Sequence, residues 1–331
     1  MLKNLARFHF FLTAFSILIF ISSCFPNEEP IQLPPAQTGI QHQSLDMGKE
    51  YENQLFINFR TNTVVHTSLY KSWDIGFSCG AKDYQIFLNG GNNVMLAKTH
   101  LKFDQITALP VDTFQWLYDS PTWDMDSTAV GNWCNAEGVG ASNVYLIKID
   151  EGDIYKLVLI SMDDNAYQIG YGTLGATEAQ LIEIPKDEAY NLNYFSFADG
   201  GKVVQPDAPK DSYDVVFTRY KHIYYYLNNF PYLVTGAMLN SFDTKAALDT
   251  VHHFEDITLA TLSELDFSIN RNTIGFEWKD YNINLGQYSI RPNVCYVIQT
   301  SNGEYYKLRF LSYYDKNGQK GHPSFEFELV K

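Results

Sequence analysis

Short stretches in which apolar and polar side chains alternate run along most of this chain. Near the C-terminus, for example, Tyr306, Leu308 and Phe310 share one face of an extended segment, and the polar side chains between them share the other. Turn-forming sequences separate such stretches, at residues 89–91, 199–201, 301–303 and 316–318. A period of two residues, broken by tight turns, predicts half-buried antiparallel strands.

One strand-like stretch occurs twice in the sequence. Residues 152–164 and residues 303–315 are identical at six of thirteen positions and lie 151 residues apart. Other similar pairs follow in the same order: 73–77 with 213–217, 103–107 with 254–258, 143–149 with 293–299, and 180–186 with 325–331. A repeat of about 145 residues is far longer than the roughly 20 to 50 residues of a solenoid unit. The repeat therefore predicts two tandem copies of one domain of ordinary size.

These patterns predict an all-β protein with two similar antiparallel β domains, a divergent first one at residues 46–186 and a second at residues 187–331. An aromatic fraction of 15% fits this fold class, because rings pack well on pleated sheets. Apolar residues at helical spacing allow one helix, at residues 256–267. Pro110 interrupts the matching stretch of the first repeat.

The first residues have the pattern of a secretory signal. Lys3 and Arg7 give a basic start, and the apolar run that follows, about 14 residues, is shorter than the roughly 20 residues of a membrane-spanning helix. The run ends in small residues before Cys24, which resembles a bacterial lipobox. We therefore expect residues 1–23 to be a lipoprotein signal peptide, and Cys24 to be the lipidation site that anchors the chain to a membrane.

Residues 24–45 contain four prolines and few apolar side chains, so we expect a flexible tether. Glu28 and Glu29 resemble the short acidic signal that directs some lipoproteins of the Bacteroidota to the outer face of the outer membrane. On that interpretation the chain is an outer membrane lipoprotein exposed at the cell surface. An acidic linker without a sorting role is the alternative, because two carboxylates form a weak charge pattern.

The charge balance excludes one class of partner. The chain has 38 acidic and 24 basic residues, which gives a formal net charge of -14 at pH 7. A nucleic-acid-binding domain needs a basic surface. We therefore expect no nucleic-acid partner.

Three cysteines remain once Cys24 is assigned to lipid: Cys79, Cys134 and Cys295. An odd number leaves at least one thiol unpaired. Cys79 and Cys134 share a repeat and are candidates for a disulfide, but the second repeat has no equivalent pair. Buried thiols are the favoured interpretation, because free cysteine behaves as a small apolar side chain.

A resemblance to a known family rests on motifs of the second repeat. Their order along the chain is YFSFADGGKVV (194–204), YDVVFTRY (213–220), FEDITLA (254–260), IGFEWKDY (274–281), NGEYYKLRFLSYY (302–314) and FEFELVK (325–331). This order resembles the HmuY family, the haem-binding lipoproteins of Bacteroidota, and the first repeat carries a divergent set of the same motifs. The resemblance implies an open-hand β fold that grips haem or a related porphyrin between side chains of its strands. It also implies a host haem protein or an outer-membrane receptor as a further partner.

The resemblance also implies where haem iron would be bound. Members that bind haem place a first ligand, His or Met, near the segment before the F-x-x-I-T motif, and this chain has His252 and His253 there. In an extended segment the two histidines point to opposite faces, so at most one lines a given pocket. His253 is the better candidate, because it shares the parity of His100 in the first repeat.

A second ligand is expected between residues 279 and 292, but that segment contains no His or Met. Tyr281 and Tyr288 could coordinate iron there, and Met238 and His222 are substitutes from outside the segment. Each substitute has a structural alternative: His222 as a hydrogen-bonded strand residue among tyrosines, and Met238 as a core residue.

No catalytic motif is supported by its context. Residues 170–175 match G-x-G-x-x-G, but no βαβ unit surrounds them, and G-x-S-x-G is absent from the chain. The sequence therefore predicts no enzyme, but a hemophore-like, lipid-anchored protein that binds haem or porphyrin and serves iron acquisition. The alternative is a structural or interaction lipoprotein, binding protein or glycan, that kept the fold and lost haem ligation.

Overall fold

A computed structural model describes residues 35–109, 115–124, 128–150 and 152–331. The predicted signal peptide, the lipidation site Cys24 and most of the predicted tether lie outside these residues. In the part of the chain that is described, no helix is long and apolar enough to cross a membrane.

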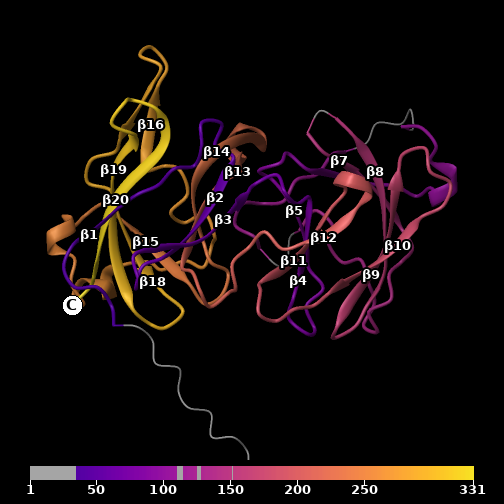
Figure 1. Ribbon diagram of the computed structural model, residues 1–331, viewed down its shortest axis with the longest axis horizontal. Coiled ribbons are helices and arrows are strands. Elements are labelled where there is room, and N and C mark those ends of the chain that lie inside the picture. The colour runs from indigo at the N-terminus through magenta and orange to yellow at the C-terminus, as the bar shows by residue number, and fades with distance from the viewer. Residues whose placement is uncertain (1–34, 110–114, 125–127, 151) are drawn as a thin grey trace, which may run out of the picture. The chain divides into compact units, whose positions relative to one another are not determined.

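The described residues form twenty β-strands, all paired antiparallel, and short 3-10 turns (Figure 1). One five-stranded sheet has the order β10-β9-β8-β7-β6, with β6 at Met95–Lys98, β7 at Val144–Lys148, β8 at Ile154–Met162, β9 at Ala166–Thr173 and β10 at Gln180–Pro185. The other has the order β1-β20-β19-β18-β15, with β1 at Gln41–Ser44, β15 at Lys245–Asp249, β18 at Cys295–Gln299, β19 at Tyr305–Tyr314 and β20 at Lys320–Leu329.

Two four-stranded sheets and one hairpin complete the fold. The first sheet has the order β12-β11-β4-β5, with β4 at Ile75–Ser78, β5 at Ile86–Leu88, β11 at Leu192–Ser196 and β12 at Lys202–Val204. The second has the order β14-β13-β2-β3, with β2 at Asn53–Asn58, β3 at Thr63–Leu69, β13 at Val215–Tyr224 and β14 at Phe230–Leu239. The hairpin pairs β16 (Lys279–Asn282) with β17 (Gln287–Ile290). The predicted all-β class is confirmed.

The helix predicted at residues 256–267 is wrong. Two 3-10 turns occupy this region, η5 at Phe254–Asp256 and η6 at Thr261–Glu264. Phe254 and Ile257 are buried against β18 in one core cluster. A 3-10 turn places side chains three positions apart on the same side, so it lets both residues reach that core.

The two repeats exchange their first strands. β1, β2 and β3 precede β4 in the chain, but they pair with β20 and β13 of the second repeat. In return, β11 of the second repeat pairs with β4 of the first repeat. Figure 1 shows the result, with the indigo strands β1 to β3 among the orange and yellow strands. Pairing therefore crosses the predicted boundary between residues 186 and 187 in both directions.

This exchange corrects one of the sequence matches. The sequence pairs residues 180–186 with residues 325–331, but β10 is the edge strand beside β9, just as β1 is the edge strand beside β20. The counterpart of β20 is therefore β9, and the counterpart of β10 is β1. The match was wrong because the edge strand β10 and the inner strand β20 have similar alternating sequences.

A buried aspartate binds the backbone of each exchanged hairpin, β2–β3 and β11–β12. The Asp214 carboxylate accepts a hydrogen bond from the Phe59 backbone N–H at 2.7 Å, and the Asp74 carboxylate accepts one from the Phe197 N–H at 2.8 Å. Asp214 and Asp74 are equivalent in the repeats, and both phenylalanines are buried. Burial raises the pKa of both carboxyls, that of Asp214 to about 7.

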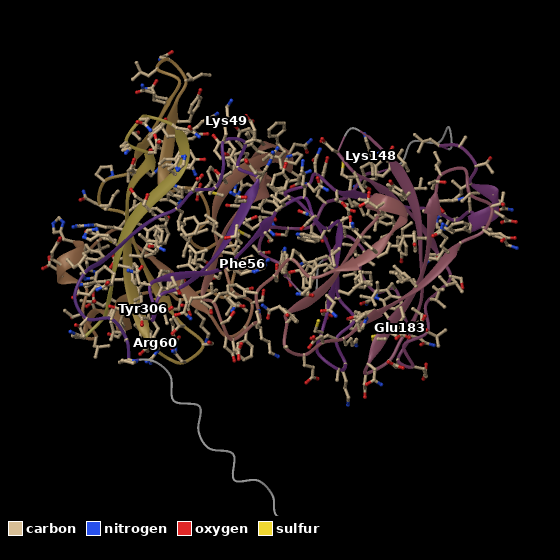
Figure 2. The ribbon with its side chains drawn as sticks, viewed as in Figure 1. Lys49, Phe56, Arg60, Lys148, Glu183 and Tyr306 are labelled. Carbon is tan, nitrogen blue, oxygen red and sulfur yellow. The ribbon has the colours of Figure 1, made fainter. Side chains whose placement is uncertain are left out.

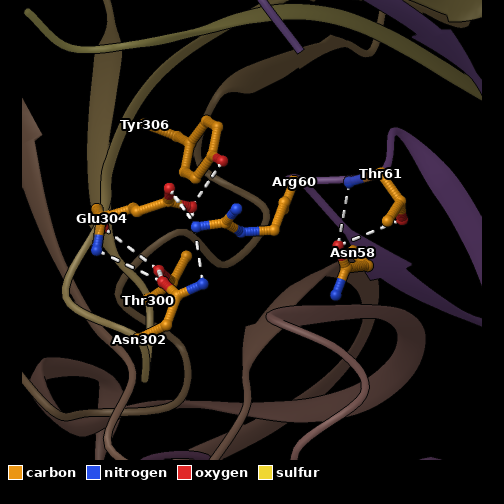
Figure 3. A network of polar contacts seen from close by, with 7 residues as sticks. All are labelled: Asn58, Arg60, Thr61, Thr300, Asn302, Glu304 and Tyr306. Atoms are coloured by element: carbon orange, nitrogen blue, oxygen red, sulfur yellow. Dashed lines mark hydrogen bonds and ion pairs between the residues drawn. The ribbon is translucent and has the colours of Figure 1, made fainter. Parts of the chain in front are cut away.

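A second contact holds the hairpin of β2 and β3 against the second repeat (Figure 3). Arg60, in the turn after β2, forms an ion pair of 2.5 Å with Glu304, and the Tyr306 hydroxyl donates to the same carboxylate at 2.9 Å. Side chains fill the space between the strands (Figure 2), where Phe56 of β2 and Tyr306 of β19 are each 1% exposed. The exchanged hairpin is thus part of the second repeat's core.

The duplicated motifs meet in equivalent contacts. The Lys156 Nζ donates to the carbonyl oxygens of Phe103 and Ile106, each at 2.7 Å. The Lys307 Nζ donates to the Ile257 carbonyl at 3.2 Å and lies 4.9 Å from the centroid of the Phe254 ring. This lysine therefore binds the F-x-x-I-T turn in both repeats.

The three cysteines that the structure describes are free thiols, so the Cys79–Cys134 disulfide is not formed. Cys79 and Cys295 are buried, and Cys134 is partly buried. Burial raises the pKa of the Cys79 thiol to about 12 and that of Cys295 to about 11. The interpretation as buried thiols is confirmed for these two residues.

Candidate functional site

A cavity of about 640 Å³ lies between the β13–β14 hairpin and the β16–β17 hairpin. We call it the aromatic pocket, because nine of its nineteen lining residues carry aromatic rings. The rings are Tyr51, Tyr224, Tyr226, Phe230, Tyr232, Phe276, Tyr281, Tyr288 and Tyr313. The remaining lining residues are Glu50, Arg219, Leu227, Leu233, Val234, Thr235, Glu277, Lys279, Asp280 and Arg291.

Strand pairing positions the rings of both hairpins. In β13 and β14, Tyr224 is paired with Phe230, next to the 3-10 turn η4 (Tyr225–Leu227) that ends the hairpin. In β16 and β17, Tyr281 is paired with Tyr288, and their ring centroids are 4.9 Å apart. Directly paired strand residues share one face of a sheet, so each hairpin presents two rings side by side.

The rings continue from one element to the next. The Tyr288 and Tyr313 centroids are 4.9 Å apart at an interplanar angle of 73°, and Tyr51 stacks on Tyr313 at 6.2 Å. Tyr224 contacts Tyr226 at 5.6 Å. Edge-to-face and stacked pairs at these distances are the arrangements that aromatic rings prefer. The pocket wall is therefore a preformed set of ring faces and edges.

The rim of the pocket is both apolar and exposed. The exposed fraction is 79% for Tyr226, 55% for Tyr281 and 52% for Phe230. Ile283 and Leu285, at the tip of the β16–β17 hairpin, are also exposed. A cluster of exposed apolar side chains around a cavity marks a surface that binds a ligand or a partner.

The charges of the pocket differ from rim to floor. Arg291 donates to the Asp280 carboxylate at 2.7 Å, and both side chains are about half exposed. Lys279 is 5% exposed, and its Nζ donates to the Thr235 carbonyl at 2.7 Å. Burial lowers the pKa of Lys279 to about 7. The floor of the pocket, formed by Thr235, Lys279 and Tyr313, therefore contains a buried amine whose pKa is lowered toward neutral pH.

His252 and His253 line a different cavity, of about 300 Å³, which we call the histidine cleft. Arg291 lines both cavities. The expectation that at most one of the two histidines lines a given pocket is wrong. The segment bends into η5 and is not a strand, so the two side chains are not forced to opposite faces.

The two histidines have different surroundings. The His252 Nδ1 is 2.9 Å from the Asp249 carboxylate, and its Nε2 is 3.7 Å from Glu264. His253 is exposed. His252 therefore holds the loop after β15, whereas His253 is open to a ligand from solvent.

The other predicted ligands fall in three places. Tyr281 lines the aromatic pocket. His222 packs edge-on against two rings of that pocket, Tyr224 at 4.7 Å and Phe276 at 5.1 Å, and burial lowers its pKa. Met238 is 2% exposed in a core cluster with Phe56, as its alternative interpretation stated.

Lys279 and the rings of β14 were not found from the sequence. Lys279 stands at an apparently polar strand position, and nothing in the alternation shows that Thr235 of β14 covers it. The aromatic run at residues 222–227 was the one available signal for the wall. Among the described residues, no group of three or more His, Cys, Asp or Glu side chains could hold a metal ion.

Solved structures show distant likeness to this chain. Apo PinO from Porphyromonas gingivitis is 9% identical, with 89% of this chain and 99% of that chain covered and a TM-score of 0.35. The apo HmuY analog of Tannerella forsythia is 10% identical, with 90% and 100% covered and a TM-score of 0.26. A protein described as HmuY-like and heme-binding from Bacteroides vulgatus is 11% identical, with 88% and 92% covered and a TM-score of 0.24.

The comparison with curated proteins gives no match. The family model of the HmuY protein matches residues 50–137 and 188–327, which together make up more than half of the chain. One matched segment falls in each repeat, which agrees with the duplication. The chain therefore belongs to the HmuY family.

Proposed function

We propose that this chain is a non-catalytic binding protein that holds haem or a related porphyrin in the aromatic pocket. The observation that carries the proposal is the pocket, a cavity of about 640 Å³ walled by nine aromatic rings in a member of the HmuY family. Its volume lies in the range of small-molecule sites, roughly 300 to 1,000 Å³. A porphyrin is flat and largely apolar, so it gains both from burial and from contact with rings.

The donor atoms of the pocket suit iron bound by phenolate. Tyrosine is one of the side chains that hold haem iron. The candidate ligands Tyr281 and Tyr288 both line the pocket. We propose Tyr281 as the iron contact, because it is 55% exposed at the rim, whereas burial raises the pKa of the Tyr288 phenol to about 12. His222 is the second choice, because its Nδ1 is buried and finds no hydrogen-bond partner among the described residues. Lowering of its pKa by burial favours the neutral imidazole that binds metals.

His253 and His252 remain proposals for a second position. They line the histidine cleft, whose volume of about 300 Å³ is small for a porphyrin. Arg291 lines both the cleft and the pocket, so a ligand that extends past Arg291 would approach the histidines. Met238 is the weakest candidate, because the core encloses it.

The setting that we propose follows from the sequence resemblance. Cys24 would carry the lipid, and the tether would hold the folded part at the outer membrane, exposed to the surface. There the protein would act as a hemophore in iron acquisition. It would take haem from a host haem protein or pass it to an outer-membrane receptor, by binding alone and without turnover.

Titration of residues 25–331 with haemin tests the proposal. We expect the Soret band of haemin to shift and saturate at one equivalent. The Tyr281→Phe variant keeps the ring and removes the phenolate, so it should bind haemin with an altered Soret band and weaker affinity. Tyr225→Phe is the matched control, because Tyr225 is exposed on the same hairpin region but does not line the pocket. An unchanged spectrum of the parent protein at all haemin concentrations rules the function out.

A glycan is the second candidate ligand. No His, Met or Cys lines the pocket within the described part of the chain, and exposed tyrosines at a rim also suit the apolar faces of sugars. On this alternative, haemin leaves the protein unchanged, and a glycan array gives binding that is lost in the Tyr226→Ala variant. Haemin binding that is unaffected by the sugars excludes it.

A further inference from the structure

The floor of the aromatic pocket holds an amine to which the described residues supply no acidic partner. Lys279 is 5% exposed, and the acceptor of its Nζ is the Thr235 carbonyl. Within the described residues, no carboxylate acts on the pKa of Lys279, whose lowering comes from burial. An ammonium can donate three hydrogen bonds, so its charged form has capacity for a further acceptor.

Rings surround this amine. The Lys279 Nζ lies 4.3 Å from the ring centroid of Trp278, 4.7 Å from that of Tyr313, and 5.7 Å from that of Tyr288. Phe276 follows at 5.8 Å. Three of these four rings and Thr235 line the pocket themselves, so the amine lies at the pocket wall and not behind it. Ring faces attract a cation at such distances.

We propose that Lys279 binds a carboxylate of the ligand at the pocket floor. This inference rests on the function proposed above, and it specifies the ligand as an acid. A porphyrin that carries propionate groups meets the requirement: its ring contacts the wall, and one carboxylate accepts a charge-assisted hydrogen bond from the Lys279 Nζ.

The protein's own ionisable groups near Lys279 do not supply the carboxylate that this amine would bind. Asp280 is paired with Arg291 at the exposed rim, and burial keeps the phenols of Tyr288 and Tyr313 neutral by raising their pKa. The remaining charged groups that line the pocket are Glu50, Arg219 and Glu277. Arg219 lies over the Tyr70 ring and donates to its hydroxyl at 3.1 Å.

Calorimetry on the unmodified protein tests the inference. Haemin dimethyl ester, which lacks both free carboxylates, should bind at least tenfold more weakly than haemin. An ester that binds as tightly as haemin overturns the role of Lys279 but leaves the proposed function standing. Absence of haemin binding overturns both.

Two variants locate the effect. Lys279→Met fills the same space without an amine, and it should bind haemin 10- to 100-fold more weakly at pH 7, with no difference between haemin and its ester. Lys221→Met is the matched control: Lys221 is also buried and also has a pKa lowered to about 7, but it contacts the Tyr118 ring outside the pocket. A Lys279→Met variant that discriminates between haemin and its ester as strongly as the parent protein overturns the inference.

Discussion

Two equivalent aspartates each accept a backbone hydrogen bond from the other repeat, and both are buried. The Phe59 N–H donates to Asp214, and the Phe197 N–H donates to Asp74. A buried carboxylate is costly in its charged form, and the hydrogen bond offsets only part of that cost. The residues that join the repeats therefore make the stability of the protein depend on pH.

We expect the Asp214→Asn variant to change this dependence. The pKa of Asp214 is raised from 3.8 to about 7, so the folded state favours the protonated form. Stability is lost as pH rises from about 4 to about 7, and the full cost persists above pH 7. The difference in the free energy of unfolding, variant minus parent, should therefore rise by on the order of 3 kcal/mol from pH 4 to pH 8. Urea unfolding of both proteins at several pH values measures this difference.

The exposed Asp211 supplies the control for that series. Asp211→Asn should leave the pH dependence of the parent unchanged. If Asp214→Asn follows the parent curve at every pH, the buried carboxylate is not the source of the pH effect.

At the scale of elements, the aromatic pocket depends on a close approach of β14 to the segment before β16. Ala237 and Gly275 are joined by two backbone hydrogen bonds of 2.9 Å. A Cβ at Gly236 would lie 2.2 Å from the Gly275 carbonyl oxygen. Thr235 and Phe276, which flank the contact, both line the pocket. The spacing of the two walls is therefore set by a position that admits no side chain.

The Gly236→Ala variant should separate these elements. A methyl group against backbone cannot be relieved by rotation of a side chain, so we expect a loss of about 2 to 3 kcal/mol in the free energy of unfolding and weaker haemin binding. Chemical denaturation and the haemin titration give the two values. Gly175→Ala is the control, since its Cβ would meet only the Thr107 carbonyl, at 3.9 Å. Equal stability of the two variants would contradict the close approach.

At the scale of the whole molecule, strand exchange joins the repeats more closely than a linker does. Residues 46–186 contain the hairpin of β2 and β3, but β13, the partner of β2, lies outside that range. They also lack β11, the partner of β4, and β12, which pairs with β11. Residues 71–207 contain β4 to β12, so both of their sheets are complete. Unpaired sheet edges are a liability, and a fragment with complete sheets avoids them.

We therefore expect the two fragments to behave differently, although their lengths are nearly equal. Residues 71–207 should fold alone, with cooperative thermal unfolding followed by circular dichroism. Residues 46–186 should aggregate or stay unfolded, and so should residues 187–331, which lack β1 to β3. Cooperative unfolding of the 46–186 fragment by itself would show that the exchanged strands are dispensable.

The sequence by itself determined the strands, the duplication and the family, because a period of two residues and the spacing of motifs are local properties. Only the tertiary structure decided which strands pair, since the backbone hydrogen bonds of one strand suit any neighbour and the exchanged partners lie more than 100 residues apart. The same holds for Lys307 and Lys279. Alternation places each on the polar face of a strand, but the turn or strand that covers this face, and so buries the amine, comes from elsewhere in the chain.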